Sequence, residues 1–271
     1  CVTGVQTCAL PISDLGQLPS AVRDRAILTT LGPAPALVVL PESASAPPPV
    51  LLWLHGRQAS KEIDPGRALR LLRAGIGFIG VDLPGHGERA VASYQTVEGT
   101  LQTILEMSQE LDDVHAAIVG DLRVDPEQIA IGGMSAGGMA AAHRLVTPHP
   151  YRAMLMEAST GNWAAQAHRP MFQPLSPEAL QAQDPMARLA TWTPIPVLAQ
   201  HSRLDEWIRF EGQCEFLEAL RERNAGHPVE LQAYDQTGAP KEHIGFGKFG
   251  AQAKDLCRDF LLRIFGSNSR R

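Results

Sequence analysis

Short runs of apolar residues alternate along the chain with longer segments whose apolar residues recur at helical spacing. The runs VLLWLHG and IGFIGVDLPG are apolar almost throughout, which is typical of strands buried on both faces of a sheet. Segments between such runs carry helix-start signals, such as Asp64 followed by Pro65 before several leucines. The pattern predicts strands near residues 25–31, 36–42, 50–56, 76–85, 128–135, 152–159, 194–202 and 229–234. It predicts helices near residues 64–74, 98–122, 136–146, 210–224 and 248–265.

This alternation predicts an α/β fold with a mostly parallel central sheet and helices on both of its faces. In such sheets the reactive groups gather at the carboxyl ends of the strands. Residues 161–193, rich in Pro, Gln and Ala, interrupt the alternation. We interpret them as a small cap with two short helices, which begin at Ser176 and Asp184, each followed by a proline. The cap is then an insertion in one domain that spans residues 13–271.

The first twelve residues do not follow the pattern. Val2 to Ile12 reads VTGVQTCALPI, which is the translation of a common sequencing-library adapter, and this stretch shows neither a sustained period nor a capping signal. We therefore expect residues 1–12 to be a translated artefact that takes no part in the fold.

The amino-acid composition limits which kinds of molecule the protein can bind. The net charge of −5 gives no basic patch for nucleic acid or an anionic membrane, and no apolar run reaches the roughly 18 residues that span a bilayer. Outside the first twelve residues only Cys214 and Cys257 remain, both in helical segments without paired spacing. We expect buried thiols, with a single disulfide between them as the alternative, no metal site, and a cytoplasmic protein that acts on a small molecule.

The residues from Gly133 to Gly137 read GMSAG and match the pattern G-x-S-x-G. The pattern follows the apolar strand IAIG and opens a helix of small residues, which is the context of a nucleophile elbow. Glycines permit a tight bend that projects the Ser135 hydroxyl above the sheet. The amino end of the following helix adds positive potential where negative charge would develop. We therefore predict that Ser135 is a nucleophile.

A serine nucleophile requires a base, and the base requires an acid that orients it. Of nine histidines, His243 lies in the loop after the last strand, where the order Ser, acid, His places the base. His227 precedes that strand and should lie at the opposite edge of the sheet. Asp205 follows the strand before it and is the predicted acid, with Glu206 beside it as the alternative.

Two backbone N–H groups should stabilise the oxyanion of an acyl-transfer intermediate. The first is expected from Ala136, directly after the nucleophile. The second is expected from the loop after VLLWLHG, at Arg57 or alternatively Gln58, with His55 as a hydrogen-bonded scaffold residue rather than a proton carrier.

Met134 and Trp163 are expected to line the substrate pocket. The sequence has no metal-ligand spacing, no phosphate loop and no G-x-G-x-x-G that opens a βαβ unit. We expect neither a metal ion nor a cofactor.

Taken together, these motifs resemble the α/β-hydrolase superfamily, and most closely the small bacterial carboxylesterases related to dienelactone hydrolases and to prolyl-oligopeptidase catalytic domains. The resemblance covers about Leu37 to Phe265. It rests on LLWLHGRQASKE, GVDLPGHGER, DVHAAIVGDLRVDPEQIAIGGMSAGG, PVLAQHSRLDEWI and the His243 loop. It departs at Ser202, where Gly is usual, and at Arg209, where Pro is common. Dienelactone hydrolases proper have Cys at the position of Ser135, and the oligopeptidases carry a propeller for which this chain has no room.

The resemblance implies a cofactor-free Ser-His-Asp esterase. A cap this short has too little surface to enclose a long acyl chain, so short-chain acyl esters are the expected substrates. Thioesters and amides or peptides remain alternatives because the same constellation serves every acyl group. A non-catalytic binding protein on this fold is an alternative from another class.

Overall fold

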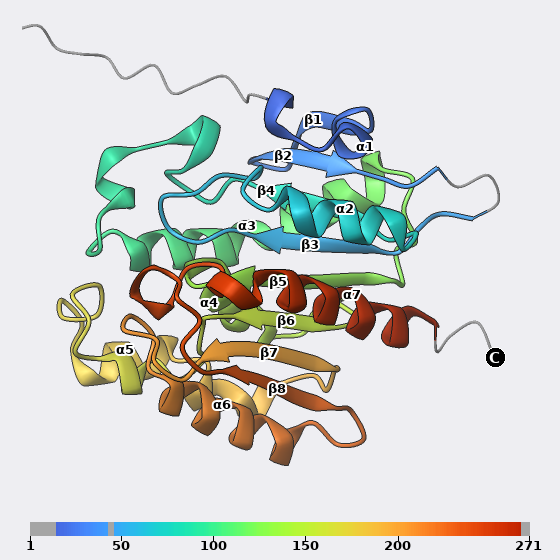
Figure 1. The fold of residues 1–271 in the computed structure, drawn as a ribbon. Coiled ribbons are helices and arrows are strands. Elements are labelled where there is room, and N and C mark those ends of the chain that lie inside the picture. Colours follow the sequence, from blue (N-terminus) through green and yellow to red (C-terminus); the bar gives the residue numbers. More distant parts are fainter. Residues whose placement is uncertain (1–14, 43–45, 267–271) are drawn as a thin grey trace, which may run out of the picture.

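A computed structural model of the protein describes residues 15–42 and 46–266. The predicted artefact at residues 1–12 lies outside the described residues. Eight strands form one sheet in the order β1-β2-β4-β3-β5-β6-β7-β8. The pairs β1–β2 and β2–β4 are antiparallel, and every later pair is parallel. Figure 1 shows the sheet with helices on both sides, which confirms the predicted α/β-hydrolase fold.

The predicted strands and helices are all present, with ends that shift by a few residues. The strands are β1 (Ala26–Leu31), β2 (Ala34–Val39), β3 (Val50–Leu54), β4 (Gly77–Val81), β5 (Ile129–Met134), β6 (Met154–Glu157), β7 (Val197–Ser202) and β8 (Val229–Tyr234). The helices are α1 (Ser20–Arg23), α2 (Pro65–Arg73), α3 (Thr100–Asp121), α4 (Ala136–Leu145), α5 (Pro177–Gln183), α6 (Phe210–Arg223) and α7 (Gly250–Gly266).

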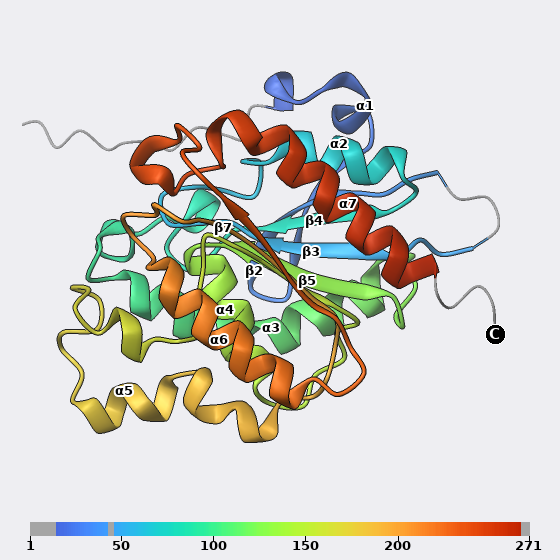
Figure 2. The same ribbon diagram turned by 60° about the horizontal axis from the view of Figure 1, so that its bottom comes forward.

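The two faces of the sheet bury separate apolar cores. Helices α3, α4 and α6 cover one face, and α1, α2 and α7 cover the other, as Figures 1 and 2 show from two directions. Strands β3 and β4 are buried along their whole length, as their continuous apolar runs predicted. Because β3, β5, β6, β7 and β8 run parallel, their carboxyl ends meet at one edge of the sheet, where the candidate site lies.

The segment predicted as a cap connects β6 to β7 (Figure 2). Its helix α5 begins where predicted, because the Ser176 side chain accepts a hydrogen bond from the N–H of Ala179 at 3.2 Å. The second short helix is a 3₁₀ turn, Met186–Thr191. Asp184 before it accepts from the N–H groups of Trp163, Ala164 and Met186, so it joins the two ends of the cap.

Both predicted thiols are free. Cys257 is buried in α7, and Cys214 in α6 is partly buried. Among residues 15–42 and 46–266, no helix has the length and apolar character needed to cross a membrane.

A buried ion pair ties α2 to the end of β6. The guanidinium of Arg67 donates from Nη2 to both carboxylate oxygens of Glu157 at 2.8 Å and from Nε to Asp64 at 2.8 Å. Its plane lies over the ring of Trp53, 3.9 Å from the centroid. Gln200 donates a further hydrogen bond to Glu157 at 3.1 Å. Both charged groups are buried away from water, so each is stabilised mainly by its hydrogen bonds to the other.

We expect Glu157→Leu to lower the free energy of unfolding by about 3–5 kcal/mol, because it leaves Arg67 buried without its main partner. The double variant with Arg67→Met should recover most of this loss. Glu230→Leu is the matched control: Glu230 pairs with Arg263 at the surface, and an exposed pair contributes less than about 1 kcal/mol. Urea denaturation measures all three. Equal losses for Glu157→Leu and Glu230→Leu would contradict the role of the buried pair.

Candidate active site

Ser135 lies in a sharp bend between β5 and α4. Its backbone has φ 51° and ψ −117°, a conformation that costs a residue with a side chain about 1–3 kcal/mol. The two glycines of the motif explain why the bend persists. A Cβ on Gly133 would lie 2.4 Å from the backbone of Gly137, and a Cβ on Gly137 would lie 2.3 Å from the carbonyl oxygen of Leu54. The close approach of α4 to β3 therefore fixes Ser135 in the predicted elbow geometry.

The structure brings Ser135, His243 and Asp205 together in one chain of hydrogen bonds. Nε2 of His243 lies 2.9 Å from Oγ of Ser135, and Nδ1 of His243 lies 2.8 Å from Oδ2 of Asp205. An ionised carboxylate can only accept, so Nδ1 carries the proton. Nε2 is then free to accept the hydroxyl proton of Ser135. This is the arrangement that general-base activation of a serine needs.

Asp205 is held as an anion. Its Oδ1 accepts hydrogen bonds from the N–H groups of Trp207 and Ile208, each at 2.8 Å. His201 contributes a second imidazole, with Nε2 3.3 Å from Oδ2. Burial alone would raise the pKa of Asp205, but the hydrogen bonds from His201 and His243 lower it to about 2. Glu206, the alternative acid, instead pairs with Lys241 at the surface.

Trp207 packs directly on the predicted base. Its ring stacks on His243 with 5.5 Å between centroids and an interplanar angle of 22°. The guanidinium of Arg57 lies over the same indole, 4.9 Å from its centroid. Trp207 therefore restricts the orientation of His243. It also connects the loop after β7, which carries Asp205 and is called the acid loop below, to the loop after β3.

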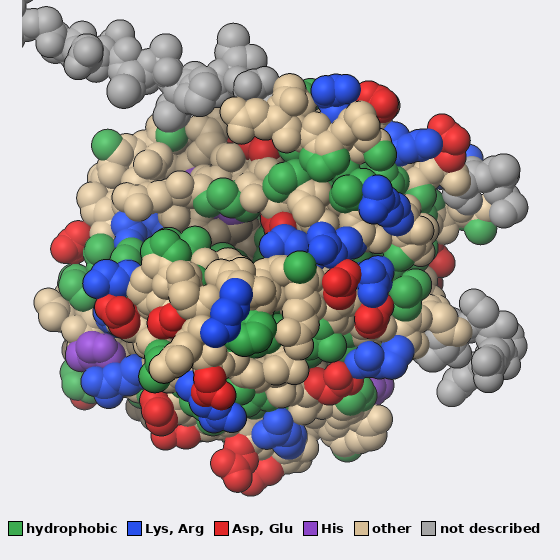
Figure 3. Space-filling model, viewed as in Figure 1, with side chains coloured by type: hydrophobic (Ala, Val, Ile, Leu, Met, Phe, Trp, Pro, Cys, Tyr) green, Lys and Arg blue, Asp and Glu red, His purple; other side chains and the backbone are tan. Residues whose placement is uncertain are grey.

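A pocket of about 440 Å³ opens beside Ser135 and His243. Figure 3 shows a hollow near the centre of the face seen in Figure 1, with Lys and Arg side chains beside it. Met134 lines this pocket, as predicted, together with Trp53 and Phe246. A volume of this size lies in the range of pockets that bind whole small molecules.

Trp163, the other residue predicted to line the pocket, does not reach it. The side chain has no exposed surface and packs between His143 and Phe172, at centroid distances of 5.3 and 5.5 Å. The large apolar ring gains more from burial in the core beneath the cap than from lining an open pocket. The cap reaches the neighbourhood of Ser135 through Arg169 and Met171 instead.

The loop after β3 lies against the nucleophile. A Cβ on Gly56 would lie 3.6 Å from Cβ of Ser135. Within the described part of the chain, the backbone N–H groups of Arg57 and Ala136 have no hydrogen-bond partner. The N–H of Gln58, the alternative donor, also has none among the described residues, so Ala136 and either residue of the loop after β3 remain available as hydrogen-bond donors.

His55 is a scaffold residue, as predicted. Its Nε2 accepts the N–H of Leu83 at 3.0 Å, and its Nδ1 donates to the carbonyl oxygen of Gly56 at 2.7 Å. Burial lowers the pKa of His55 to about 3, so the ring is neutral. The ring thereby fixes the start of the loop after β3 to the residues that follow β4.

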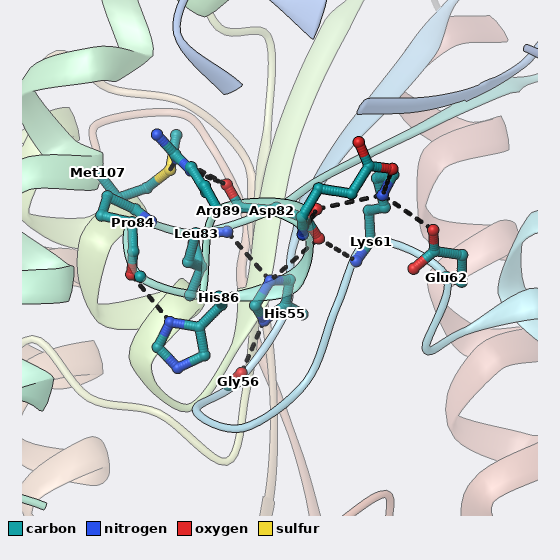
Figure 4. Close-up of polar contacts among 12 residues, drawn as sticks. His55, Gly56, Lys61, Glu62, Asp82, Leu83, Pro84, His86, Arg89 and Met107 are labelled. Atoms are coloured by element: carbon teal, nitrogen blue, oxygen red, sulfur yellow. Dashed lines mark hydrogen bonds and ion pairs between the residues drawn. The ribbon is translucent and has the colours of Figure 1, made fainter. Parts of the chain in front are cut away.

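A buried Lys61–Asp82 ion pair holds the far end of the same loop (Figure 4). The carboxylate of Asp82 accepts from the backbone N–H of Lys61 at 2.8 Å and from its ammonium at 3.1 Å. Burial alone would lower the pKa of Lys61, but hydrogen bonds to Glu88 and Glu62 and the charge of Asp82 raise it. The loop is therefore closed at both ends by buried polar groups.

Sequence reasoning missed several of these supporting residues. Asp82 and Glu157 both carry a charge at the carboxyl end of an apolar strand, FIGVD and MLME, and that signal could have indicated them. His201 also ends a strand, but nothing in the sequence indicates that it faces Asp205. Trp207 carries no sequence signal that links it to His243.

A nucleophile elbow, a hydrogen-bonded Ser-His-Asp set and an eight-stranded, mostly parallel sheet define a serine hydrolase of the α/β-hydrolase fold. The model of the prolyl oligopeptidase family matches residues 67–268, which is most of the chain. The chain belongs to this family.

One curated relative is similar in sequence, and solved structures are similar in fold. Esterase YjfP of Escherichia coli is 26% identical over 190 residues, covering 65% of this chain and 76% of the esterase. A puromycin-hydrolyzing peptidase of Mycobacterium tuberculosis superposes with a TM-score of 0.75 at 17% identity, over 92% of this chain. The chain spans only 40% of the length of that peptidase. TT1662 of Thermus thermophilus superposes with a TM-score of 0.66 at 24% identity, over 88% of this chain and 98% of TT1662.

We expect the stability of the protein to fall as the pH drops from 6.5 to 5, in part through His55. Its folded-state pKa is about 3, below the ordinary value of 6.5, so only the unfolded chain takes up this proton in that range. The stabilisation is complete above pH 6.5 and is lost as the pH falls toward 3. His55 alone should account for roughly 1–2 kcal/mol between pH 6.5 and 5.

Urea denaturation at both pH values tests this. His55→Asn should flatten the pH dependence, even though it lowers stability at neutral pH. His227, exposed before β8, provides the control variant His227→Asn, which should keep the wild-type slope. An unchanged slope in His55→Asn would show that other groups cause the acid sensitivity.

Proposed function

We propose that the protein is a carboxylic-ester hydrolase that acts on short-chain acyl esters through an acyl-enzyme on Ser135. The observation that carries this proposal is the continuous hydrogen-bonded set from Ser135 through His243 to Asp205, with 2.9 and 2.8 Å between successive atoms. The curated relative named as an esterase supports the ester preference, because it matches 65% of this chain.

The first step forms a bond between Oγ of Ser135 and the ester carbonyl carbon while Nε2 of His243 takes the hydroxyl proton. The carbonyl oxygen becomes an anion, and the N–H groups of Ala136 and Arg57 donate hydrogen bonds to it. Asp205 stabilises the imidazolium that has formed. The imidazolium then gives its proton to the alcohol oxygen as the ester bond breaks.

The second step reverses the roles. A water molecule gives a proton to Nε2 of His243 and attacks the acyl carbon. The second tetrahedral intermediate collapses, Ser135 regains its proton from His243, and the carboxylic acid leaves. No cofactor or metal takes part in this sequence, since every proton has a donor and an acceptor among these residues and water.

Amide or peptide hydrolysis is a second candidate, because the family is named for oligopeptidases and a structural relative is a peptidase. Thioester hydrolysis uses the same steps. These alternatives are separated by assaying esters, thioesters and amides of one acyl group on the same protein. A protein that only binds ligands would release no product from any of them.

Ser135→Ala should lower kcat for a p-nitrophenyl ester by roughly 10⁶, and His243→Ala should cost a similar factor. Asp205→Ala should cost about 10⁴, and the three losses should not add, because the residues act as a unit. Ser93→Ala, at an exposed serine, is the control and should retain wild-type activity. A phosphonate probe should label Ser135 alone. Esterase activity that survives Ser135→Ala would exclude this mechanism.

Activity should be highest for acyl chains of about two to six carbons and should fall steeply beyond. Each buried methylene contributes about 0.8 kcal/mol, so the preference climbs only while the pocket has room for the chain. The cap turns Trp163 into the core and so offers little surface to a longer chain. Measurements of kcat/KM for p-nitrophenyl esters from acetate to palmitate test this. A maximum at long chains, or no trend, would overturn it.

A further inference from the structure

Two compartments of very different size meet at Ser135. The large one is the pocket of about 440 Å³, and the small one has a volume of about 90 Å³. Both are lined by Arg57, Ser135 and Trp207. The stacked pair of Trp207 and Arg57 therefore lies where the two compartments join. A substrate that fills both compartments has one half on each side of this junction.

The small compartment adjoins the predicted oxyanion site. Ala136 lines it, and His243 does not. Its other walls are largely apolar and come from α3, α4, the acid loop and the cap, with Met139 and Met171 among them. An apolar cavity of about 150 Å³ binds benzene, so a compartment of about 90 Å³ is smaller than one known to hold an aryl ring and suits an acyl chain of a few carbons better.

The large compartment adjoins the base. His243 lines it, and Ala136 does not. Its walls include the aromatic rings of Trp53 and Phe246, and Ile63 and Ile244 are 60% and 54% exposed while lining it. Exposed aliphatic side chains of this size at a pocket lose unfavourable contact with water when a ligand covers them.

The chemistry of the proposed reaction decides which half of an ester goes where. The carbonyl oxygen must point to the N–H of Ala136, and once the alcohol faces His243 the acyl chain is the remaining substituent, which the small compartment can receive. The alcohol oxygen must receive its proton from Nε2 of His243, so the alcohol lies in the large compartment. We propose that the substrates are short-acyl esters of bulky, ring-containing alcohols. The proposal rests on the ester hydrolysis proposed above and names the substrate class of that same site.

Met139 and Met171 then determine acyl specificity, while Ile63 and Ile244 contribute to binding of the alcohol. Acyl length and alcohol size become independent properties, because different walls set them. A cap of this kind limits the acyl half alone and leaves the alcohol side open to large groups.

Benzyl acetate and methyl phenylacetate provide a matched pair of substrates. They are isomers in which the ring lies on the alcohol side or on the acyl side, and their leaving alcohols have similar acidity. We expect kcat/KM for benzyl acetate to exceed that for methyl phenylacetate by at least about tenfold, after each is divided by its rate of alkaline hydrolysis. Equal values, or a preference for methyl phenylacetate, would overturn the assignment.

Substitutions of residues that line each compartment test the assignment of the acyl and alcohol halves. Met171→Ala enlarges the small compartment and should reduce the ratio between the two substrates severalfold by raising activity on methyl phenylacetate. Val97→Ala, at a partly exposed wall of the same compartment, repeats the test if Met171→Ala lowers the melting temperature. Ile244→Ala, in the large compartment, should raise KM for benzyl acetate without raising activity on methyl phenylacetate. A gain on methyl phenylacetate from Ile244→Ala, and none from the other two, would reverse the assignment.

The outcomes separate the two proposals. If no ester is hydrolysed, including p-nitrophenyl acetate, the proposed function fails. If esters are hydrolysed by the wild type but not by Ser135→Ala, and the isomer preference is absent, only the substrate assignment fails.

Discussion

The contact between α4 and the end of β3 is the constraint on which the site depends. Gly137 lets the backbone of α4 approach the carbonyl oxygen of Leu54 so closely that no side chain fits between them. That approach forces the bend in which Ser135 takes a positive φ. The packing of large apolar cores on both faces of the sheet supplies the free energy that offsets the backbone strain at this bend. The serine hydroxyl is consequently presented before any substrate arrives, and neither the elbow nor its helix has to reorganise.

Around this bend, the chain uses buried charges to hold its loops in place. Lys61 with Asp82 closes the loop after β3, and Arg67 with Glu157 joins α2 to the strand beside Ser135. In each pair the carboxylate ends a buried strand or directly follows one. Such pairs gain little net energy over apolar packing, but each fixes one geometry because an unpaired partner would be costly. They hold these loops in one conformation, whereas surface loops without such contacts would adopt several.

The sequence predicted the fold and the three residues of the hydrogen-bonded set because each depends on position along the chain. A serine after an apolar strand, an acid after a later strand and a histidine after the last one must meet at one edge of a parallel sheet. Supporting contacts could not be predicted in this way. Arg67 and Glu157 are ninety residues apart, and their pairing depends on which face of the sheet α2 covers.

The prediction that Trp163 lines the substrate pocket failed for a related reason. Its place in an apolar, proline-rich insert is compatible with a pocket wall or with core packing, and only the path of the cap decides between them. Period and composition show that a side chain will be covered, but they do not show whether protein or ligand covers it. The same limit applies to His201, whose contact with Asp205 follows from the turn after β7.

The four tryptophans differ in solvent exposure, and this difference affects the intrinsic fluorescence of the protein. Trp53, Trp163 and Trp192 are at most 7% exposed, whereas Trp207 is only partly buried and lies against His243 and Arg57. A molecule that enters beside Ser135 changes the polarity around Trp207, and around Trp53 where it fills the large pocket, and leaves Trp163 and Trp192 in the interior. Intrinsic fluorescence therefore reports occupancy of the site without an attached dye, against a constant background from the core.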